Sequence, residues 1–278
     1  MGSEGNLNTF EASLNININL NTYIMNSDKM FEAILAEQNA HYPKNTDDVA
    51  YNYDNIDEFS SSENSIKIIF DQVNFKILYI SSTIESLGGY TYEEMTQDNM
   101  AVVFSVFAPE HSNALFNWIK WSMDMFTQTG TFTNYRGVLC GLKVYHKAGH
   151  QMRIMIRHRT IEEFENKMPK IAAVTIDNVS HLMKGDFYWG RSEFGEPENK
   201  HYHYLLSTDE KNVPMDIISN REKDVLRLIA QGMDSKEIGK TLFISPNTVD
   251  NHRRNMLKRT GMRDLTALIQ VCWMCNII

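Results

Sequence analysis

Several features that define common classes of protein are scarce or absent in this sequence. Only three cysteines occur among 278 residues, an odd and small number that supplies no disulfide framework and fits a reducing compartment. The first residues lack a basic region followed by an apolar core, and no apolar run reaches the roughly 18 residues that span a bilayer. We therefore expect no signal peptide, no contact with a membrane and a cytoplasmic location.

Motifs of catalysis and metal binding are also absent. The sequence has no phosphate-binding loop, nucleophile elbow or paired metal-ligand motif, so we expect no enzyme. His111 could ligate a haem, but a lone histidine at a helix start is more typical of a surface or capping group. The pairs His146/His150 and His201/His203 lack the two further ligands of a closed zinc site. We expect no metal, and the sequence requires no cofactor.

Charge is distributed unevenly along the chain. A length of 278 residues predicts about two domains, and 42% hydrophobic residues suffice for ordinary packed cores. The formal net charge is −8, yet residues 218–278 hold ten Lys/Arg against six Asp/Glu, a net charge of +4. Residues 1–217 then carry −12. The basic charge is concentrated where a polyanion could be bound.

The N-terminal segment, residues 1–64, is acidic. Its alternation from Leu14 to Leu20 has the period of a strand, but asparagine is a poor strand former, so disorder until a partner is met is an equal alternative for residues 1–27. Residues 28–40 place apolar side chains on one helical face. This short amphipathic helix would cover the next domain's core or serve as a dimer or signal-transfer helix.

Residues 65–182 mix strand-like and helical patterns. A hairpin is predicted over residues 66–80, Ser82 begins a helix that Gly88 ends, and a longer helix covers about 112–127. Three strands follow at about 131–146, 151–165 and 170–180. These elements predict an α+β domain, with an antiparallel sheet and helices on one face.

The segments FDQVNFKILYISSTIESLGGYTYEEM (70–95) and YRGVLCGLKVYHKAGHQMRIMIRHR (135–159) resemble a PAS domain. The resemblance covers roughly residues 65–182. It implies a sensory or dimerisation module that often binds a small ligand between sheet and helices. The reactive-cysteine flavin motif of the light-sensing branch is not seen, since Cys140 lies mid-strand. Trp118 and Trp121 could line a pocket, although packing suits Trp118 on the apolar stripe.

Residues 183–217 are rich in aromatic and polar side chains. The segments around Trp189 and Tyr204 could pair as a hairpin around Gly195-Glu-Pro197, followed by a linker. Whether this hairpin belongs to the preceding or to the following domain is open.

Residues 218–278 predict an all-α domain of four helices. Ser219 and Glu222 form a capping box for the first helix, and Asp234 or Ser235 caps the second. Ser245 caps the third, which begins at Pro246 and ends at Gly261. Two short helices joined by a tight turn, the second presenting polar side chains outward, form a helix-turn-helix.

The third helix has the pattern of a DNA reader. If Val249 faces the core, Met256 and Thr260 lie beside it, and the opposite face carries Asn247, Asn251, Arg254 and Lys258. Asparagine and arginine form paired hydrogen bonds with adenine and guanine edges, and a helix fits the major groove. A charged bundle that binds another protein is the alternative.

The segment ISNREKDVLRLIAQGMDSKEIGKTLFISPNTVDNHRRNMLKRTGMRDLTALIQ resembles the LuxR-type helix-turn-helix, across residues 218–278. The resemblance places Asp250, Asn251 and Arg254 at base edges. It also implies that four further residues contact the phosphates or backbone of the DNA: Lys236, Thr248, His252 and Lys258. Asp250 stands where the family usually has lysine, and a carboxylate repels phosphate but can accept from cytosine N4. Thr260 replaces the usual leucine.

The fourth helix, from Leu265 to about Asn276, has apolar side chains on more than one face. Leu268, Cys272 and Trp273 are the residues we expect at a homodimer interface, which would space two half-sites about one DNA turn apart. Cys272 and Cys275 could alternatively act as a redox switch or zinc pair, but no second ligand pair accompanies them.

Together these features predict a regulator of transcription that binds double-stranded DNA. The PAS-like domain would sense a small molecule or a protein and control the helix-turn-helix. In the alternative, the front half is a protein-docking platform with no small-molecule ligand.

Overall fold

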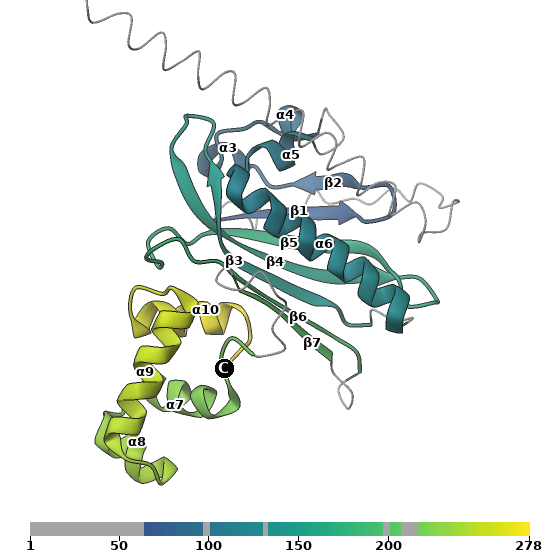
Figure 1. Ribbon diagram of the computed structural model, residues 1–278. Coiled ribbons are helices and arrows are strands. Elements are labelled where there is room, and N and C mark those ends of the chain that lie inside the picture. Colours follow the sequence, from purple (N-terminus) through teal and green to yellow (C-terminus); the bar gives the residue numbers. More distant parts are fainter. Residues whose placement is uncertain (1–63, 97–100, 130–132, 197–200, 207–215) are drawn as a thin grey trace, which may run out of the picture.

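The computed structural model describes residues 64–96, 101–129, 133–196, 201–206 and 216–278. They form a seven-stranded antiparallel sheet with helices on one face, and a four-helix domain lies beyond the other face (Figure 1). The α+β arrangement expected from the sequence, an antiparallel sheet with helices on one face followed by an all-α domain of four helices, is confirmed. The strand and helix expected within residues 14–40 lie outside the described residues.

The sheet has the order β2-β1-β5-β4-β3-β6-β7, which joins the first hairpin to the later strands through the β1–β5 pair. The elements of this part are β1 (Ser65–Asp71), β2 (Lys76–Ile80), α3 (Thr83–Leu87), α4 (Tyr92–Thr96), α5 (Ala101–Ser105), α6 (Pro109–Thr129), β3 (Arg136–Tyr145), β4 (Gln151–Glu163), β5 (Pro169–Asn178), β6 (Trp189–Phe194) and β7 (His201–Leu206).

A side-chain turn closes the first hairpin. Asp71 Oδ1 accepts hydrogen bonds from the backbone N–H groups of Val73 (2.8 Å) and Asn74 (3.0 Å), the turn geometry that short Asp side chains favour. In the strands on either side of this turn, successive side chains point to opposite faces of the sheet. Ile66, Ile68 and Phe70 thereby enter the core beneath the helices.

A glycine bulge in β3 sets the direction of its side chains. Cys140 pairs with Met155 and Leu142 with Ile154, so Gly141 is the extra residue, and its φ of +92° is open to glycine but strained for other residues. Because the alternation shifts by one residue there, Leu139 and Leu142 both belong to the core on the α6 side. Cys140 belongs to the core on the opposite side.

The hairpin of β6 and β7 extends this sheet. Its strands pair antiparallel from Trp189↔Leu206 to Phe194↔His201, and β6 also pairs with β3. The hairpin therefore belongs to the sheet domain and lies next to β3.

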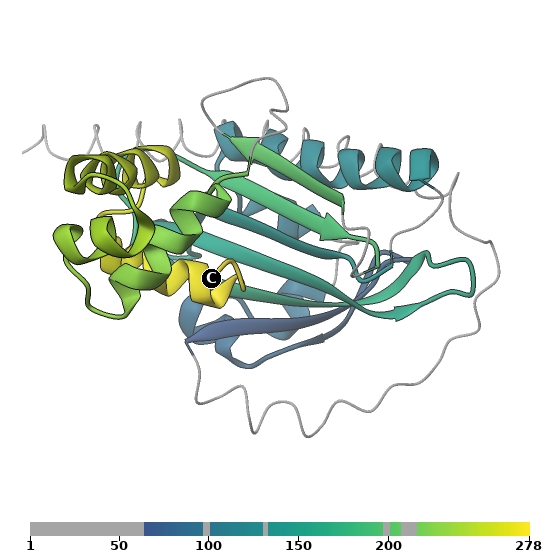
Figure 2. The ribbon, with the colours of Figure 1, turned by 90° about the horizontal axis from the view of Figure 1, so that it is seen from below.

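The four-helix domain contains α7 (Asn220–Ala230), α8 (Ser235–Leu242), α9 (Pro246–Thr260) and α10 (Leu265–Met274). It packs beside the outer face of the sheet, the face opposite α6 (Figure 2). One apolar cluster contains Cys140, Met155 and Trp189 of the sheet together with Leu268 and Ile277 of this domain. The two domains therefore share a core. None of the described helices is long and apolar enough to cross a lipid bilayer.

Candidate functional site

Side-chain caps define the helices of the helix-turn-helix. Asp234 Oδ1 accepts from the N–H groups of Lys236 and Glu237 at 2.8 Å each, and Glu237 Oε2 accepts from Asp234 N. These backbone donors lower the pKa of the Asp234 carboxyl. Ser245 Oγ accepts from Thr248 N at 3.0 Å, and Pro246 opens α9. The predicted start of α9 is confirmed.

The buried and exposed sides of α9 separate cleanly. Val249, Met256 and Thr260 are buried in the domain, and the Thr260 hydroxyl donates to Met256 O at 2.8 Å. Thr260 can therefore occupy a core position because its hydroxyl is satisfied within the helix. The predicted DNA-facing residues that are exposed are Asn247, Asp250, Asn251, Arg254 and Lys258 on α9, and Lys236 on α8; Thr248 and His252 are half-buried.

Two contacts orient the outer face of α9. Arg254 Nη2 donates to Asn251 Oδ1 at 2.5 Å, so the two side chains suited to base edges lie together one helical turn apart. Ser235 Oγ donates to Asp250 Oδ1 at 2.6 Å, which ties the start of α8 to α9. Asp250 therefore has a partner within the domain in the absence of DNA.

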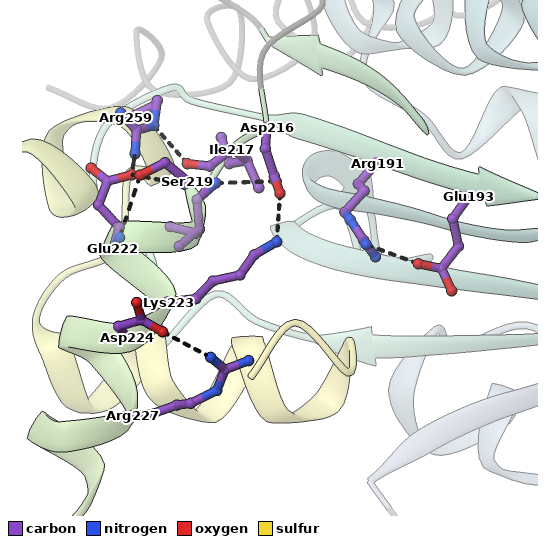
Figure 3. A network of polar contacts seen from close by, with 11 residues as sticks. Arg191, Glu193, Asp216, Ile217, Ser219, Glu222, Lys223, Asp224, Arg227 and Arg259 are labelled. Atoms are coloured by element: carbon purple, nitrogen blue, oxygen red, sulfur yellow. Dashed lines mark hydrogen bonds and ion pairs between the residues drawn. The ribbon is translucent and has the colours of Figure 1, made fainter. Parts of the chain in front are cut away.

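Not every cation of α9 faces outward. Arg259 Nε donates to Ile217 O at 2.6 Å, and its Nη2 donates to Glu222 Oε2 at 2.5 Å (Figure 3). Glu222 is 5% exposed and also accepts from Ser219 N at 2.9 Å. The same carboxylate thus caps α7 and holds the C-terminal turn of α9.

A second pair continues this network toward the linker. Lys223 Nζ lies 2.6 Å from Asp216 Oδ2 (Figure 3), with both side chains largely buried. This ion pair holds Asp216, just before the first helix of the domain, against α7.

The loop between α9 and α10 pairs through its backbone with the segment that joins β5 to β6. Lys184 N donates to Gly261 O (2.8 Å) and Arg263 N donates to Leu182 O (2.9 Å). A Cβ on Gly261 would lie 2.7 Å from Phe187 Cβ. The glycine therefore ends α9 at φ +67° and also leaves room for the aromatic ring of Phe187.

The end of α10 contacts the outer face of the sheet. Arg157 Nη1 donates to Met274 O at 3.2 Å, and its Nε donates to Asp177 Oδ2 at 3.0 Å. Cys275 Sγ lies 3.5 Å from Met155 Sδ. These contacts hold the four-helix domain against β4.

All three cysteines lie in this shared core. Cys140, Cys272 and Cys275 are free and buried, and the first two are at most 1% exposed. Burial raises the pKa of the Cys140 and Cys272 thiols and raises that of Cys275 to about 12. Since the thiolate is the reactive form, these thiols are poorly reactive while the four-helix domain packs against the sheet.

Of the three residues expected at a dimer interface, two are buried and one is exposed. Leu268 and Cys272 are 0% and 1% exposed because they pack into the chain's own core, whereas Trp273 is 57% exposed. In this arrangement Trp273 is the one of these three that a second copy can reach.

A cavity of about 280 Å³ lies between the inner face of the sheet and helices α3–α6. Trp118 of α6 lines it and is 6% exposed. Trp121 instead packs near Phe194, with ring centroids 6.5 Å apart. Of the two tryptophans considered, Trp118 serves both the core and the cavity wall.

The histidines considered as ligands have other contacts. His111 is buried and its Nδ1 accepts from Lys143 N at 2.7 Å, and burial lowers the pKa of its imidazole. His146 and His150 stack at 4.3 Å across their turn. Within the described residues no group of three His, Cys, Asp or Glu side chains could hold a metal ion.

Comparison with protein families identifies the C-terminal domain. Residues 216–272 match the GerE family model, described as bacterial regulatory proteins of the luxR family. Residues 216–272 are a LuxR-type domain. The sequence resemblance to the LuxR-type helix-turn-helix is therefore confirmed.

Two curated relatives share a similar segment. The nitrate/nitrite response regulator protein homolog of Haemophilus influenzae is 40% identical over 63 residues, which cover 23% of this chain and 30% of that protein. The oxygen regulatory protein NreC of Staphylococcus aureus is 37% identical over 57 residues, covering 20% and 26%. The chain thus matches less than a third of the length of either relative.

The solved structures that match this chain are more distant in sequence. A structure of the Vibrio cholerae VqmA dimer, a LuxR-type receptor, is 14% identical, covers 82% of this chain and 89% of that chain, and has a TM-score of 0.29. The N-terminal PAS/PAC sensor domain of a diguanylate cyclase from Marinobacter aquaeolei is 14% identical, covers 42% and 96%, and has a TM-score of 0.33.

Sequence reasoning missed residues that hold the LuxR-type domain against the sheet and residues that hold its own helices together. Arg157 lies in a strand among several cations, and nothing in its spacing distinguishes it from Arg153 or Arg159. Arg259 is similarly hidden among the cations of α9. A signal existed only for Glu222, which the capping box identified, although its second partner lies 37 residues away.

Proposed function

We propose that the chain is a sequence-specific DNA-binding regulator of transcription, in which the PAS-like domain senses a ligand or partner and controls the LuxR-type domain. The observation that carries this proposal is the exposed face of α9. Asn247, Asn251, Arg254 and Lys258 lie on it, and the opposite face is buried. Arginine and asparagine can read guanine and adenine in the major groove, and Lys258 suits a phosphate.

The direct contact between the domains supports control by the sensor. In this proposal the sensor comprises residues 65–182 with the following hairpin, and residues 218–278 bind double-stranded DNA. A change in β3 or β4 would reach α10 through the shared core and through Arg157. A signal that binds the docked and undocked arrangements with different affinity would shift the balance between them.

We further propose that DNA is bound by a homodimer. Trp273 is the exposed aromatic side chain of α10, and large aromatic residues often anchor interfaces. Leu268 and Cys272 would support the dimer interface from inside the domain. If the domain separates from the sheet, their face of α10 would also be exposed to a second copy. Two copies would then read two half-sites about one turn of DNA apart.

The decisive experiment is selection of binding sites from random duplex DNA by the purified full chain, over a series of salt concentrations. Arg254→Ala and Asn251→Ala should lose the selected motif. Arg227→Ala is the matched control, because Arg227 is exposed on α7 and pairs with Asp224 at 3.3 Å. A motif kept by Arg254→Ala, or lost equally by Arg227→Ala, would contradict the assignment of α9 as the reader.

A protein-docking sensor without a small-molecule ligand is the second candidate. The exposed Tyr202 of β7 and Tyr145 of β3 favour it to a limited extent, because each places an aromatic side chain on the surface. It predicts DNA binding that changes with a partner protein and not with any small molecule that fills the cavity.

A further inference from the structure

The cavity beneath α6 has mainly apolar walls. Isoleucine, leucine, valine, methionine and phenylalanine side chains from the sheet and from α3–α6 form most of its lining. Its volume of about 280 Å³ is near the lower end of the ~300–1,000 Å³ range of small-molecule sites. The space therefore suits a small, largely apolar molecule.

One end of the cavity carries a connected band of polar groups. Gln72 Nε2 and His158 Nε2 are 3.0 Å apart, and the His158 ring lies edge-on to Tyr135 at 5.2 Å between centroids. The Tyr135 hydroxyl lies 3.2 Å from Ser122 Oγ. All four side chains line the cavity and form one connected group, while Tyr90, Tyr145 and Asn178 also line it.

This polar end carries no charge at neutral pH. Burial lowers the pKa of His158 to about 4 and raises the pKa of Tyr135, so both remain neutral. Among the described residues that line the cavity there is no Lys, Arg, Asp or Glu. A carboxylate, phosphate or ammonium group would therefore be desolvated without an opposite charge, which is strongly unfavourable.

We propose that this cavity binds a neutral, mainly apolar small molecule whose single hydrogen-bonding end lies against Gln72, His158 and Tyr135. The inference rests on the proposed sensing function and specifies its ligand class. Amides and imidazoles both donate and accept, so a hydroxyl, amide or ring nitrogen on the ligand can be satisfied there.

The test compares pairs of probes that share an apolar body and end in either a neutral hydroxyl or a charged carboxylate. Binding of 4-ethylphenol and 4-ethylbenzoate, and of 1-octanol and octanoate, to the full chain would be measured at pH 7.5 by calorimetry, and by the fluorescence of Trp118 and the other tryptophans. The neutral member of each pair should bind at least roughly tenfold more tightly. Equal binding, tighter binding of the anion, or no saturable binding of either neutral member would overturn the inference.

A variant tests the polar end. His158→Phe keeps a flat ring and removes its nitrogens, so affinity for 4-ethylphenol should fall about fivefold to tenfold, while affinity for toluene should be unchanged. His150→Phe is the control, because His150 is exposed on a turn and does not line the cavity. Equal loss for both probes in His158→Phe would mean damage to the cavity and not a lost hydrogen bond.

Failure of this inference is separable from failure of the proposed function. The same preparations would be tested for DNA binding with wild-type protein and Arg254→Ala. Specific DNA binding without preference for neutral probes would refute the ligand class alone, whereas absence of specific DNA binding would refute the regulator. The probe measurements on wild-type protein do not depend on whether His158→Phe folds.

Discussion

Arg157 and His158 are neighbours on β4 and serve opposite faces of the sheet. His158 lines the cavity beneath α6, and Arg157 Nη1 donates to Met274 O at the end of α10. Alternation of side chains along a strand places consecutive residues on opposite faces. One peptide unit therefore connects the candidate ligand site to the contact that holds the LuxR-type domain.

Replacing Arg157 should loosen the contact between the domains. Arg157→Ala removes the bonds to Met274 and Asp177, and a charge-assisted hydrogen bond of this kind contributes roughly 1–2 kcal/mol. The thiols of Cys140 and Cys275 should then react with an aromatic disulfide reagent about tenfold faster, because undocking uncovers them.

Arg159→Ala is the control for that measurement, since Arg159 is exposed two residues further along β4. In Arg159→Ala the thiols of Cys140 and Cys275 should react as slowly as they do in wild-type protein. Unchanged thiol reactivity in Arg157→Ala would argue that the apolar core alone holds the two domains together.

The fixed arginine of α9 should matter for stability and little for DNA. Arg259→Ala leaves the 5% exposed Glu222 without its guanidinium partner, and loss of one member of a buried pair costs about 2–4 kcal/mol. Urea unfolding at pH 7 would measure the change in the free energy of unfolding. Arg263→Ala removes a half-exposed arginine that pairs with Asp264, and should change that free energy by less than about 1 kcal/mol. Similar losses in both variants would show that Glu222 does not depend on Arg259.

The stability of the chain should fall in mild acid because of His158. Its pKa is about 4 in the folded chain against an ordinary value of 6.5, so between these values only the unfolded chain binds the proton. Stability is therefore full above pH 6.5 and declines as pH falls toward 4, by at most about 3 kcal/mol. Urea unfolding of wild-type protein and His158→Gln at pH 7.5 and pH 5 would measure this, with a smaller decline expected in the variant.

His150→Gln provides the comparison for the pH experiment and should retain the wild-type decline. The work should stay above about pH 4.5, because the carboxyls of Asp234 and Asp264 have lowered pKa values from backbone hydrogen bonds. They add a separate loss of stability at lower pH. A decline in His158→Gln as large as that of wild-type protein would exclude His158 as its source.

Local signals in the sequence were sufficient for the helices of the LuxR-type domain and for the character of the sheet. Ser219, Ser245 and Gly261 determine helix ends through bonds to backbone groups a few residues away, so short-range reasoning finds them. The exposed face of α9 follows from the helical period for the same reason.

Long-range relationships could not be predicted in this way. Gly261 was identified as a helix end, but its contact with Phe187 depends on how two domains pack. Leu268 and Cys272 were expected to meet a second copy because α10 has excess apolar surface, and a helix pattern does not specify which neighbour covers it. The bulge at Gly141 likewise decides which side of the sheet Cys140 faces, and one residue of register reverses that choice.

The aspartate on the outer face of α9 should limit affinity for DNA. The resemblance to the LuxR-type family implies that lysine is usual at the position of Asp250, whose carboxylate accepts a hydrogen bond from Ser235. Asp250→Lys replaces a charge that repels DNA with one that attracts it, so non-specific affinity should rise. The dependence of that affinity on salt should steepen by the release of about one to two more counterions. Asp224→Lys makes the same change of charge on α7, where the half-buried Asp224 pairs with Arg227. Titration of duplex DNA at 50–300 mM salt, about the usual range for such slopes, would compare the two. A steeper slope in Asp250→Lys and not in Asp224→Lys would place Asp250 at the DNA surface, whereas equal slopes would indicate that only the net charge of the domain matters.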